Sequence, residues 1–488
     1  MPHSKPVALI DVGSNSVRLV IYDGMKRAPM PLFNEKVLCG LAKNISTTGV
    51  LNEKGVERAF TAIKRFIGLS EVMKVRTLSL FATSAVRDAK DGADFVNRVK
   101  DELGVDIEVF SEEDEAKYAG MGIISAMTSP CGVVGDLGGG SLELINVDGD
   151  RIGKGVSYPI GPLRLSNMAK DYSQINKTVE DYIKKFPLKK HLRGNNFYAV
   201  GGSFRNLAKV HMGRKNYPLK VIHNYKVDAD DIMTTIMILS RMSEESLLKI
   251  PGVSKKRMKL LPYAALILKH IIKLGKPKTI VFSASGVREG VLYSQLDEEQ
   301  MHKDPLICGS IEMMTRMLRK PEYGYELASW MKPLFANDDS ISEERLRLAA
   351  CIMSEISCYE NTEYRAELAY RKILDSSLTG LNHKDRLFIA KSLYFRYSTY
   401  PDDNILSTMG TLLNSKKVQN AQVVGAAMRL ARSLSCSSDG VLEKTKLQVN
   451  NNTISLAVSD DKTQLLGESV KKRVKQLAEL LGMEAKVI

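Results

Sequence analysis

Hydrophobic and polar residues in the first two thirds of the chain follow the pattern of alternating strands and helices. Short apolar runs at residues 7–10, 77–82 and 196–200 have the length of buried strands. Residues 55–69 instead place their apolar side chains at helical spacing, and residues 279–283 form a last apolar run. Short strands that alternate with amphipathic helices predict an α/β fold.

The pattern restarts at Gly132 and changes again further along. Residues 126–304 repeat the opening order, so two α/β domains, 1–125 and 126–304, are expected to enclose a cleft. Long amphipathic patterns then predict a helical module over 305–415, and residues 416–488 are expected to form a small α/β piece. The later helices are expected at 343–359, 363–374, 384–397, 421–434 and 468–481, and a strand pair at 442–449 and 453–458.

Two apolar runs end in the same short motif. The first motif is residues 11–18 (DVGSNSVR) and the second is residues 136–143 (DLGGGSLE), with Asp, Gly and Ser at matching steps. A second apolar stretch follows each motif, which predicts a β-hairpin with a tight turn. Glycine lets backbone N–H groups approach a ligand, and such turns bind phosphate oxygens, while the acid can hold a divalent cation. Two facing copies would form a phosphate clamp.

Lysine and arginine exceed aspartate and glutamate, 70 against 56, which gives the 488-residue chain a net charge of +14. This surplus indicates either an anionic partner or a solvated basic surface. The single Trp and the aromatic content of 7% offer few stacking platforms, which argues against nucleic acid. Scattered cysteines and the lack of an evident signal peptide or transmembrane span predict a cytoplasmic protein with no membrane partner.

Six motifs occur in an unbroken order between residues 6 and 300. They are the two turns above and residues 82–87 (ATSAVR), 111–118 (SEEDEAKY), 200–203 (VGGS) and 285–290 (SGVREG). Together they resemble the exopolyphosphatase/guanosine pentaphosphate phosphohydrolase (Ppx/GppA) family. The resemblance implies a duplicated actin-like ATPase (ribonuclease H-like) fold in two halves with a cleft, and a homodimer.

Three acids are candidate metal ligands. Asp136 and Glu143 lie seven residues apart on opposite arms of one turn, and Asp11 would enter from the facing hairpin. Mg²⁺ prefers few carboxylates together with water and phosphate oxygens. The alternative is that Asp11 and Asp136 only accept hydrogen bonds from turn N–H groups. The resemblance implies that Asp136 and Glu143 are metal-linked, with Mg²⁺ or Mn²⁺ as the cofactor.

Glu115 is the candidate general base. A carboxylate near the start of a helix in the cleft could deprotonate a water molecule for attack on a terminal phosphorus. Its neighbours Glu112, Glu113 and Asp114 are also acids, and first-turn acids are usually exposed partners of the helix dipole. The residues alone do not separate the four. The resemblance implies Glu115, which matches the catalytic Glu of the family.

Arginines and small turn residues are expected to bind the substrate phosphates. Arg18, Arg87 and Arg288 each end a turn motif, and a guanidinium can bind two phosphate oxygens at once. A lone arginine is more often part of a surface ion pair of small effect, so the family motifs decide for substrate binding. The remaining candidates supply N–H donors or hydroxyls from the turns: Ser14, Asn15, Gly138, Gly139, Gly140, Ser141, Gly201, Gly202 and Ser203.

The helical module resembles, at residues 345–356 and 380–386, the HD-type domain of longer family members. The His–Asp metal dyad of HD phosphohydrolases should fall near Ser354 and Glu355, where no histidine occurs, so we expect an HD-like module without a second metal site. Such a module would extend the substrate channel or mediate dimerisation. Basic clusters that could follow a long polyanion, or simply be solvated, are residues 184–185, 189–190, 255–257 and 471–473.

The leading hypothesis is an exopolyphosphatase, a phosphoric anhydride hydrolase that removes the terminal phosphate of inorganic polyphosphate by metal-assisted in-line attack of water. A pppGpp 5′-phosphatase would share every catalytic residue, and the long basic chain favours polyphosphate. Two alternatives belong to other classes. One is a non-catalytic protein that binds polyphosphate or the alarmone, and the other is a sugar or acetate kinase with an adenosine pocket at residues 200–203.

Overall fold

The computed structural model divides the chain into two compact units, one ending at His302 and the other beginning at Lys303. Within the described residues, no helix is long and apolar enough to cross a membrane. The basic cluster at residues 255–257 lies outside the described residues. The structure describes residues 5–488 except for residues 44, 169–170, 241, 243–244, 247–257, 318–319, 337–339 and 410–411.

Five strands form the first sheet of the first unit, in the order β3-β2-β1-β4-β5. They are β1 (Val7–Val12), β2 (Ser16–Tyr22), β3 (Pro31–Leu38), β4 (Thr77–Ala82) and β5 (Glu108–Val109). Side chains alternate along β1, so that Ala8, Ile10 and Val12 pack on one face and Val7 and Leu9 on the other. Both faces of the central strand are therefore buried, as its short apolar run predicts.

Helices α2 (Glu53–Val72) and α4 (Gly92–Leu103) cover one face of the first sheet, while α1 (Ile45–Thr48) and α3 (Ser84–Asp88) are short. The start of α2 is capped by Asn52, whose side chain accepts the N–H of Gly55 at 2.9 Å. The end of α4 is set by Gly104, which has a φ of 68° in the left-handed region.

The second sheet of the first unit has the order β11-β12-β10-β6-β7-β8, and β9 also pairs with β7. In the second sheet, β6 pairs antiparallel with β7 on one side, and the parallel strands β10 and then β12 follow on the other side. The first sheet has the same arrangement, with β1 paired to β2 on one side and followed by the parallel strands β4 and β5 on the other. This repeat confirms the expected duplicated fold. The strands are β6 (Cys131–Leu137), β7 (Leu142–Asp148), β8 (Arg151–Ile152), β9 (Val156–Tyr158), β10 (Asn196–Val200), β11 (Tyr225–Asp228) and β12 (Thr279–Phe282).

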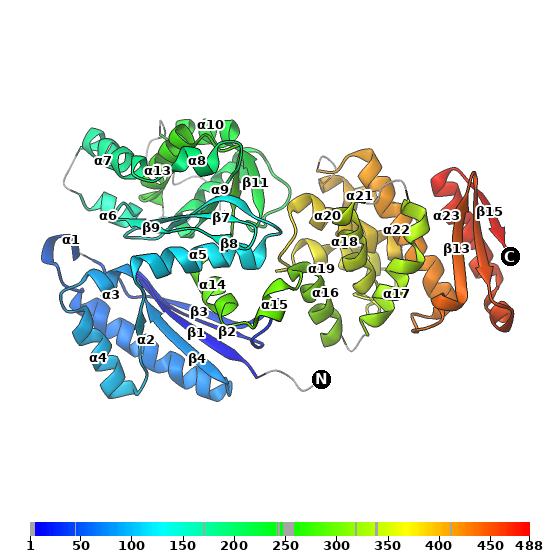
Figure 1. Ribbon diagram of the computed structural model, residues 1–488, viewed down its shortest axis with the longest axis horizontal. Helices are drawn as coiled ribbons and strands as arrows, with labels where there is room; N and C mark the ends of the chain where they lie inside the picture. The colour runs from blue at the N-terminus through cyan, green and yellow to red at the C-terminus, as the bar shows by residue number, and fades with distance from the viewer. Residues whose placement is uncertain are drawn as a thin grey trace. The chain divides into compact units, whose positions relative to one another are not determined.

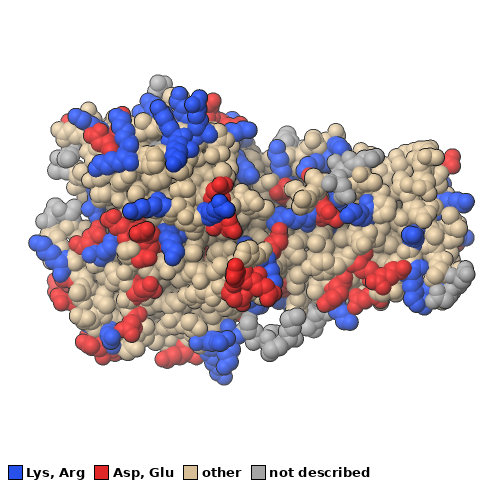
Figure 2. Space-filling view, viewed as in Figure 1, with Lys and Arg blue, Asp and Glu red and all other residues tan. Residues whose placement is uncertain are grey.

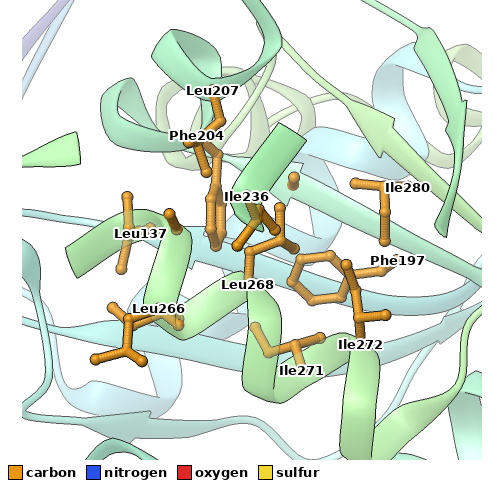
Figure 3. Close-up of a cluster of buried hydrophobic side chains, with 14 of the residues drawn as sticks. Leu137, Phe197, Phe204, Leu207, Ile236, Leu266, Leu268, Ile271, Ile272 and Ile280 are labelled. Atoms are coloured by element: carbon orange, nitrogen blue, oxygen red, sulfur yellow. The ribbon is translucent and has the colours of Figure 1, made fainter. Parts of the chain in front are cut away.

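One face of the second sheet is covered by α9 (Gly202–Arg214), α10 (Ala229–Leu239) and α13 (Leu261–Gly275). Phe197 and Phe204 meet edge to face in this core at 5.9 Å between ring centroids (Figure 3). The unit also contains α5 (Glu112–Ala126), α6 (Pro162–Ser166), α7 (Tyr172–Lys184), α8 (Leu188–Leu192), α14 (Val287–Ser294) and α15 (Glu298–His302).

Helices α5 and α14 lie side by side between the two sheets (Figure 1). Helix α5 packs on the second sheet, and Val291 and Leu292 of α14 pack on the first. The two backbones approach so closely that a Cβ at Gly122 would lie 2.1 Å from the carbonyl oxygen of Gly286, and one at Gly290 1.8 Å from that of Tyr118. Glycines at this crossing therefore fix how the two halves of the unit meet.

The second unit is a helical body followed by the three-stranded sheet β13-β14-β15. The helix expected over 343–359 ends at Ile352, because the next turn bonds to another helix: Ser357 N–H donates to the Tyr397 hydroxyl, which donates to Ser354 O, both at 3.3 Å. The division of this unit at residue 415 stays a prediction. The helices are α16 (Pro305–Arg316), α17 (Glu322–Trp330), α18 (Ile341–Ile352), α19 (Arg365–Leu374), α20 (His383–Tyr397), α21 (Asp403–Leu406), α22 (Ser415–Ser435) and α23 (Glu468–Leu481), and the strands are β13 (Thr445–Asn450), β14 (Thr453–Val458) and β15 (Glu484–Val487).

A pair of glycine substitutions tests the packing of the first unit. Gly135→Ala would put a Cβ 2.3 Å from Phe197 Cζ, so we expect a destabilisation of about 1–3 kcal/mol. Gly68→Ala, inside α2 with no atom within 4 Å of the new Cβ, should instead stabilise by about 0.5–1 kcal/mol. Scanning calorimetry of the full chain measures both. Equal shifts of the unfolding temperature for the two variants would contradict this packing.

Candidate active site

A cavity of about 300 Å³ lies in the first unit, lined by both hairpin turns, the start of α5 and the starts of α9 and α14. It brings together most of the residues singled out in the sequence. Three of them, Arg18, Arg87 and Gly140, are not among its lining residues, and Gly140 lines a small adjoining cavity. The predicted residues that line the cavity are Asp11, Ser14, Asn15, Glu115, Asp136, Gly138, Gly139, Ser141, Glu143, Gly201, Gly202, Ser203 and Arg288.

The two hairpin turns have the same internal hydrogen bond. Gly13 N–H donates to Ser16 O at 3.0 Å, and Gly138 N–H donates to Ser141 O at 3.1 Å. The turns face each other, because a Cβ added at Gly139 would lie 3.7 Å from the Cβ of Ser14. The repeated motif thus builds two turns of similar geometry on opposite sides of one cavity.

Gly201 joins β10 to the N-terminus of α9 and requires glycine. Its φ is +96°, and a Cβ there would lie 2.4 Å from Leu137 O and 2.9 Å from Asp136 Oδ1. The close approach brings the first turn of α9 to the cavity beside Asp136. A helix N-terminus presents unpaired N–H groups and favours negative charge, as a phosphate-binding wall needs.

The four acids at the start of α5 have different surroundings. Glu112 and Glu113 are exposed, and Asp114 is used in the capping box, where it accepts the N–H of Ser111 at 3.1 Å. Glu115 alone is buried, at 6% exposure, and lines the cavity. The structure therefore separates four acids that the sequence alone leaves equivalent.

Glu115 is paired with Arg87, whose guanidinium donates to Glu115 Oε2. Burial raises the pKa of Glu115 to about 7, and the negative charges of Asp136 and Asp11 add to this rise while Arg87 opposes it. Arg87 is therefore not part of the cavity lining, but it bonds the Glu115 carboxylate, which is. A carboxylate with this pKa changes protonation near neutral pH, which suits a general base.

Asp136 and Glu143 are direct partners across the β6–β7 hairpin. Glu143 is 4% exposed and accepts a hydrogen bond from Ser157 Oγ at 2.9 Å. Burial raises the pKa of both carboxyls, to about 6 for Asp136 and well above its usual range for Glu143, where the charges of Glu115 and Asp136 add to the effect. Glu115, Asp136 and Glu143 line the same cavity, and their carboxylates repel each other unless a cation or protons compensate the charge.

Basic side chains lie close to the acids, although Arg18 is not in the cavity lining. Arg288 donates to Asp11 Oδ2 at 2.9 Å, and Arg18 donates to Asn34 Oδ1 at 2.8 Å. Arg205 of α9 and Lys36 of β3 also line the cavity and were missed in the sequence. The one available signal was that Arg205 follows the Gly-Gly-Ser motif by two residues on the same helix. Lys36 gave no signal, because it belongs to an edge strand outside every motif.

The comparisons with known proteins agree with this geometry. A family model described as the Ppx/GppA phosphatase family matches residues 20–299, more than half of the chain. The chain belongs to the Ppx/GppA phosphatase family. A second model, described as exopolyphosphatase, C-terminal, matches residues 306–488. Membership supports a phosphatase activity.

Relatives within and around this family cover different shares of the chain. Retrograde regulation protein 2 of Saccharomyces cerevisiae is 26% identical over 436 residues, 80% of this chain and 72% of that protein. Exopolyphosphatase 1 of Mycobacterium tuberculosis is 24% identical over 306 residues, 60% of this chain and 89% of that protein.

Among solved structures, the Ppx/GppA family member of Aquifex aeolicus has a TM-score of 0.52 at 27% identity and covers 59% of this chain and 97% of its own. An exopolyphosphatase of Cytophaga hutchinsonii has a TM-score of 0.53 at 25% identity, with the same coverage. These Ppx/GppA structures support the duplicated fold seen in the two sheets.

The predicted metal ligands of this Ppx/GppA chain fit a cation that binds together with substrate. Within the described residues, no group of three or more His, Cys, Asp or Glu side chains is placed to hold a metal by itself. Asp11 is bonded to Arg288, which leaves the facing pair Asp136 and Glu143 as the available donors. Mg²⁺ commonly binds through one or two carboxylates with water and phosphate oxygens, so two donors suffice. The ligand roles stay predictions.

Replacing Glu143 tests the charge balance of the site. In the unfolded chain the Glu143 carboxyl titrates near its usual pKa of about 4.3, whereas its pKa in the folded protein is well above that value. Between the two pKa values the folded protein therefore binds more protons than the unfolded chain. Stability is therefore lost as pH rises, and Glu143→Gln removes the loss. We expect Glu143→Gln to raise the unfolding temperature at pH 8 and to change it little at pH 5.

The measurement is calorimetry in buffer with a chelator, with the exposed Glu71→Gln of α2 as the control that should change neither value. An equal shift at both pH values in Glu143→Gln would contradict the balance described.

Proposed function

We propose that this protein is an exopolyphosphatase, which releases orthophosphate from the end of inorganic polyphosphate. The observation that carries the proposal is the position of Glu115, buried and paired with Arg87 in a cavity between two phosphate-type turns. The exopolyphosphatase C-terminal match and the resemblance to named exopolyphosphatases support the same substrate.

In the proposed reaction, the N–H groups of the two turns and of the first turn of α9 hold the oxygens of the terminal phosphoryl group. Water attacks the phosphorus in line with the bridging oxygen. The new O–P bond forms as the bridging P–O bond breaks, and the chain leaves one phosphate shorter. Glu115 takes the proton of the attacking water, and Arg87 keeps its carboxylate oriented.

Charge neutralisation is the second requirement of phosphoryl transfer. Arg288 and Arg205 line the cavity and supply positive charge beside the phosphate chain. Family members generally depend on a divalent metal, which would neutralise phosphate charge when held by Asp136 and Glu143. The choice of Mg²⁺ or Mn²⁺ rests on the family resemblance.

The basic clusters bear on the length of the substrate. Lys and Arg side chains gather on one face of the first unit, over the region of α8 and α10 (Figure 2). Lys184 and Lys185 at the end of α7, and Lys189 and Lys190 in α8, are exposed, and none of them lines the cavity. A long polyanion that leaves the cavity would be attracted by such a surface, more strongly at low salt.

Hydrolysis of pppGpp is the closest alternative, because the same residues would act on its 5′-phosphate. A regulatory role without catalysis is a second candidate, and one observation favours it: the yeast relative that spans 80% of this chain is named for retrograde regulation. The acids of the cavity favour catalysis, since a protein that only binds phosphate gains nothing from placing Glu115, Asp136 and Glu143 around it. A homodimer, as implied by the resemblance, is part of the proposal.

Replacing Glu115 tests the proposed base. Glu115→Gln keeps the shape of the side chain but cannot accept the proton, so we expect phosphate release from long-chain polyphosphate with Mg²⁺ to fall by about 10²–10⁴-fold. The matched control is Glu113→Gln, an exposed residue of the same helix turn, which should keep near wild-type activity. Phosphate release is measured from polyphosphate and from pppGpp side by side.

Equal losses in both variants would contradict the role of Glu115. A strong preference of the wild type for pppGpp would transfer the function to the alarmone phosphatase. No release from either substrate would favour the regulatory protein.

The pH dependence of kcat/KM tests the environment of Glu115. Because burial raises its pKa to about 7, the active carboxylate form is lost below that pH, and kcat/KM should fall about tenfold per pH unit. Arg87 opposes this rise, so Arg87→Gln should move the acid limb to higher pH. A limb that stays in place in Arg87→Gln would belong to the substrate and would contradict the assignment.

A further inference from the structure

The hairpin turn at residues 138–141 of the candidate active site is bonded directly to the start of α6. Gly161 N–H donates to Gly140 O at 3.1 Å, and Leu163 N–H donates to Gly139 O at 2.9 Å. A Cβ at Gly161 would lie 2.4 Å from Gly139 O, so the two segments lie backbone against backbone with no room for a side chain. The turn and the first residues of α6 therefore hold each other in place.

Helix α6 contains Arg164, which reaches from the second half of the first unit to the first half. Its Nη2 donates to Oδ2 of Asp88, at the end of α3, at 3.0 Å. The side chains of Arg164 and Asp88 are 30% and 36% exposed, and ion pairs this exposed contribute little to stability. Neither residue lines the main cavity, although Arg164 lines the small cavity that adjoins it.

Asp88 uses its other carboxylate oxygen on Arg87. Arg87 Nε lies 3.3 Å from Asp88 Oδ1. Arg87 Nη1 donates to Phe110 O at 3.0 Å and to Glu115 Oε2. Burial opposes the charged form of Arg87, but the hydrogen bond and charge of Glu115, followed by the charge of Asp88, outweigh it and raise its pKa. Because a guanidinium is a rigid plane, holding its Nε edge also fixes where Nη1 points.

We propose that Arg164 and Asp88 are positioning residues, which connect the turn at residues 138–141 to the Glu115 carboxylate through Arg87. The inference rests on the proposed function, in which this turn holds the terminal phosphate and Glu115 takes the proton of the attacking water. A misplacement of about 1 Å between reacting groups can cost about 10²-fold in rate. One set of contacts that fixes both the phosphate-binding turn and the base therefore acts on the chemical step.

Direct contact with the substrate is the other use that Arg164 could have. Its Nη2 lies 4.0 Å from the position of a Cβ at Gly140, so the guanidinium is beside the turn. The same Nη2 is bonded to Asp88, however, and the lining of the main cavity includes Leu163 but not Arg164. Loss of a residue that binds substrate and transition state equally raises KM, whereas loss of a positioning residue lowers kcat.

Steady-state kinetics of phosphate release from long-chain polyphosphate with Mg²⁺ test the proposal in the full chain. Asp88→Asn keeps the shape of the side chain and loses its charge, so we expect kcat to fall about tenfold with KM changed less than about twofold. Arg164→Gln should lower kcat to a similar extent, and Arg164→Lys, which keeps the charge, should recover most of it. Asp106→Asn is the matched control, because Asp106 forms an exposed ion pair with Lys100 at 2.9 Å in the same unit.

A double-mutant cycle separates positioning from a general effect on the fold. If Asp88 acts through Arg87, then Asp88→Asn should cause no further loss of kcat in a protein that already contains Arg87→Gln. The unfolding temperature of Asp88→Asn should stay near that of the wild type, because the side chain is partly exposed.

Additive losses in the double variant would overturn the inference. So would a rise of KM in place of the fall of kcat, or wild-type kinetics in both Asp88→Asn and Arg164→Gln while Glu115→Gln is inactive. Phosphate release that survives in Glu115→Gln would instead overturn the proposed role of the base, and the positioning role with it.

Discussion

The close crossing of α5 and α14 is the contact on which the candidate active site depends. Each helix packs on a different sheet, and glycines at 122, 286 and 290 let the two backbones touch where any side chain would collide. The same two helices begin at the cavity with Glu115 and Arg288. The crossing therefore joins the halves of the fold and sets the positions of the proposed base and of one arginine in a single contact.

The carboxylates that line the cavity repel each other, and this repulsion destabilises the fold. Glu115, Asp136 and Glu143 line the same cavity, and desolvation raises the pKa of each. Removing such charges from water costs stability, which glycine-rich turns and arginines only partly offset. A divalent cation that binds with an anionic substrate would balance these charges. We therefore interpret the cost in stability as a consequence of a site arranged to bind a metal and phosphate.

The fold and most of the site were predictable because their signals are local. The two Asp-x-Gly motifs encode their own turns, and the strand runs and amphipathic helices encode the layers. The choice of Glu115 among four acids rested on the family resemblance, because its burial depends on how α5 packs on the sheet. Arg205 and Lys36 were missed for a related reason, since neither belongs to a turn and both reach the cavity through tertiary packing.

The second unit shows the same limit more clearly, since Glu355 meets Arg396 and Arg432 across 41 and 77 residues of sequence. Each unit contains a buried glutamate that accepts a hydrogen bond from arginine, but the charges around the two glutamates differ. One arginine beside other acids leaves Glu115 with a pKa near 7, able to exchange a proton. Two arginines outweigh the effect of burial and keep Glu355 ionised. The first arrangement suits a base and the second a structural ion-pair network, so the number of neighbouring charges, and not the residue type, decides what each glutamate can do.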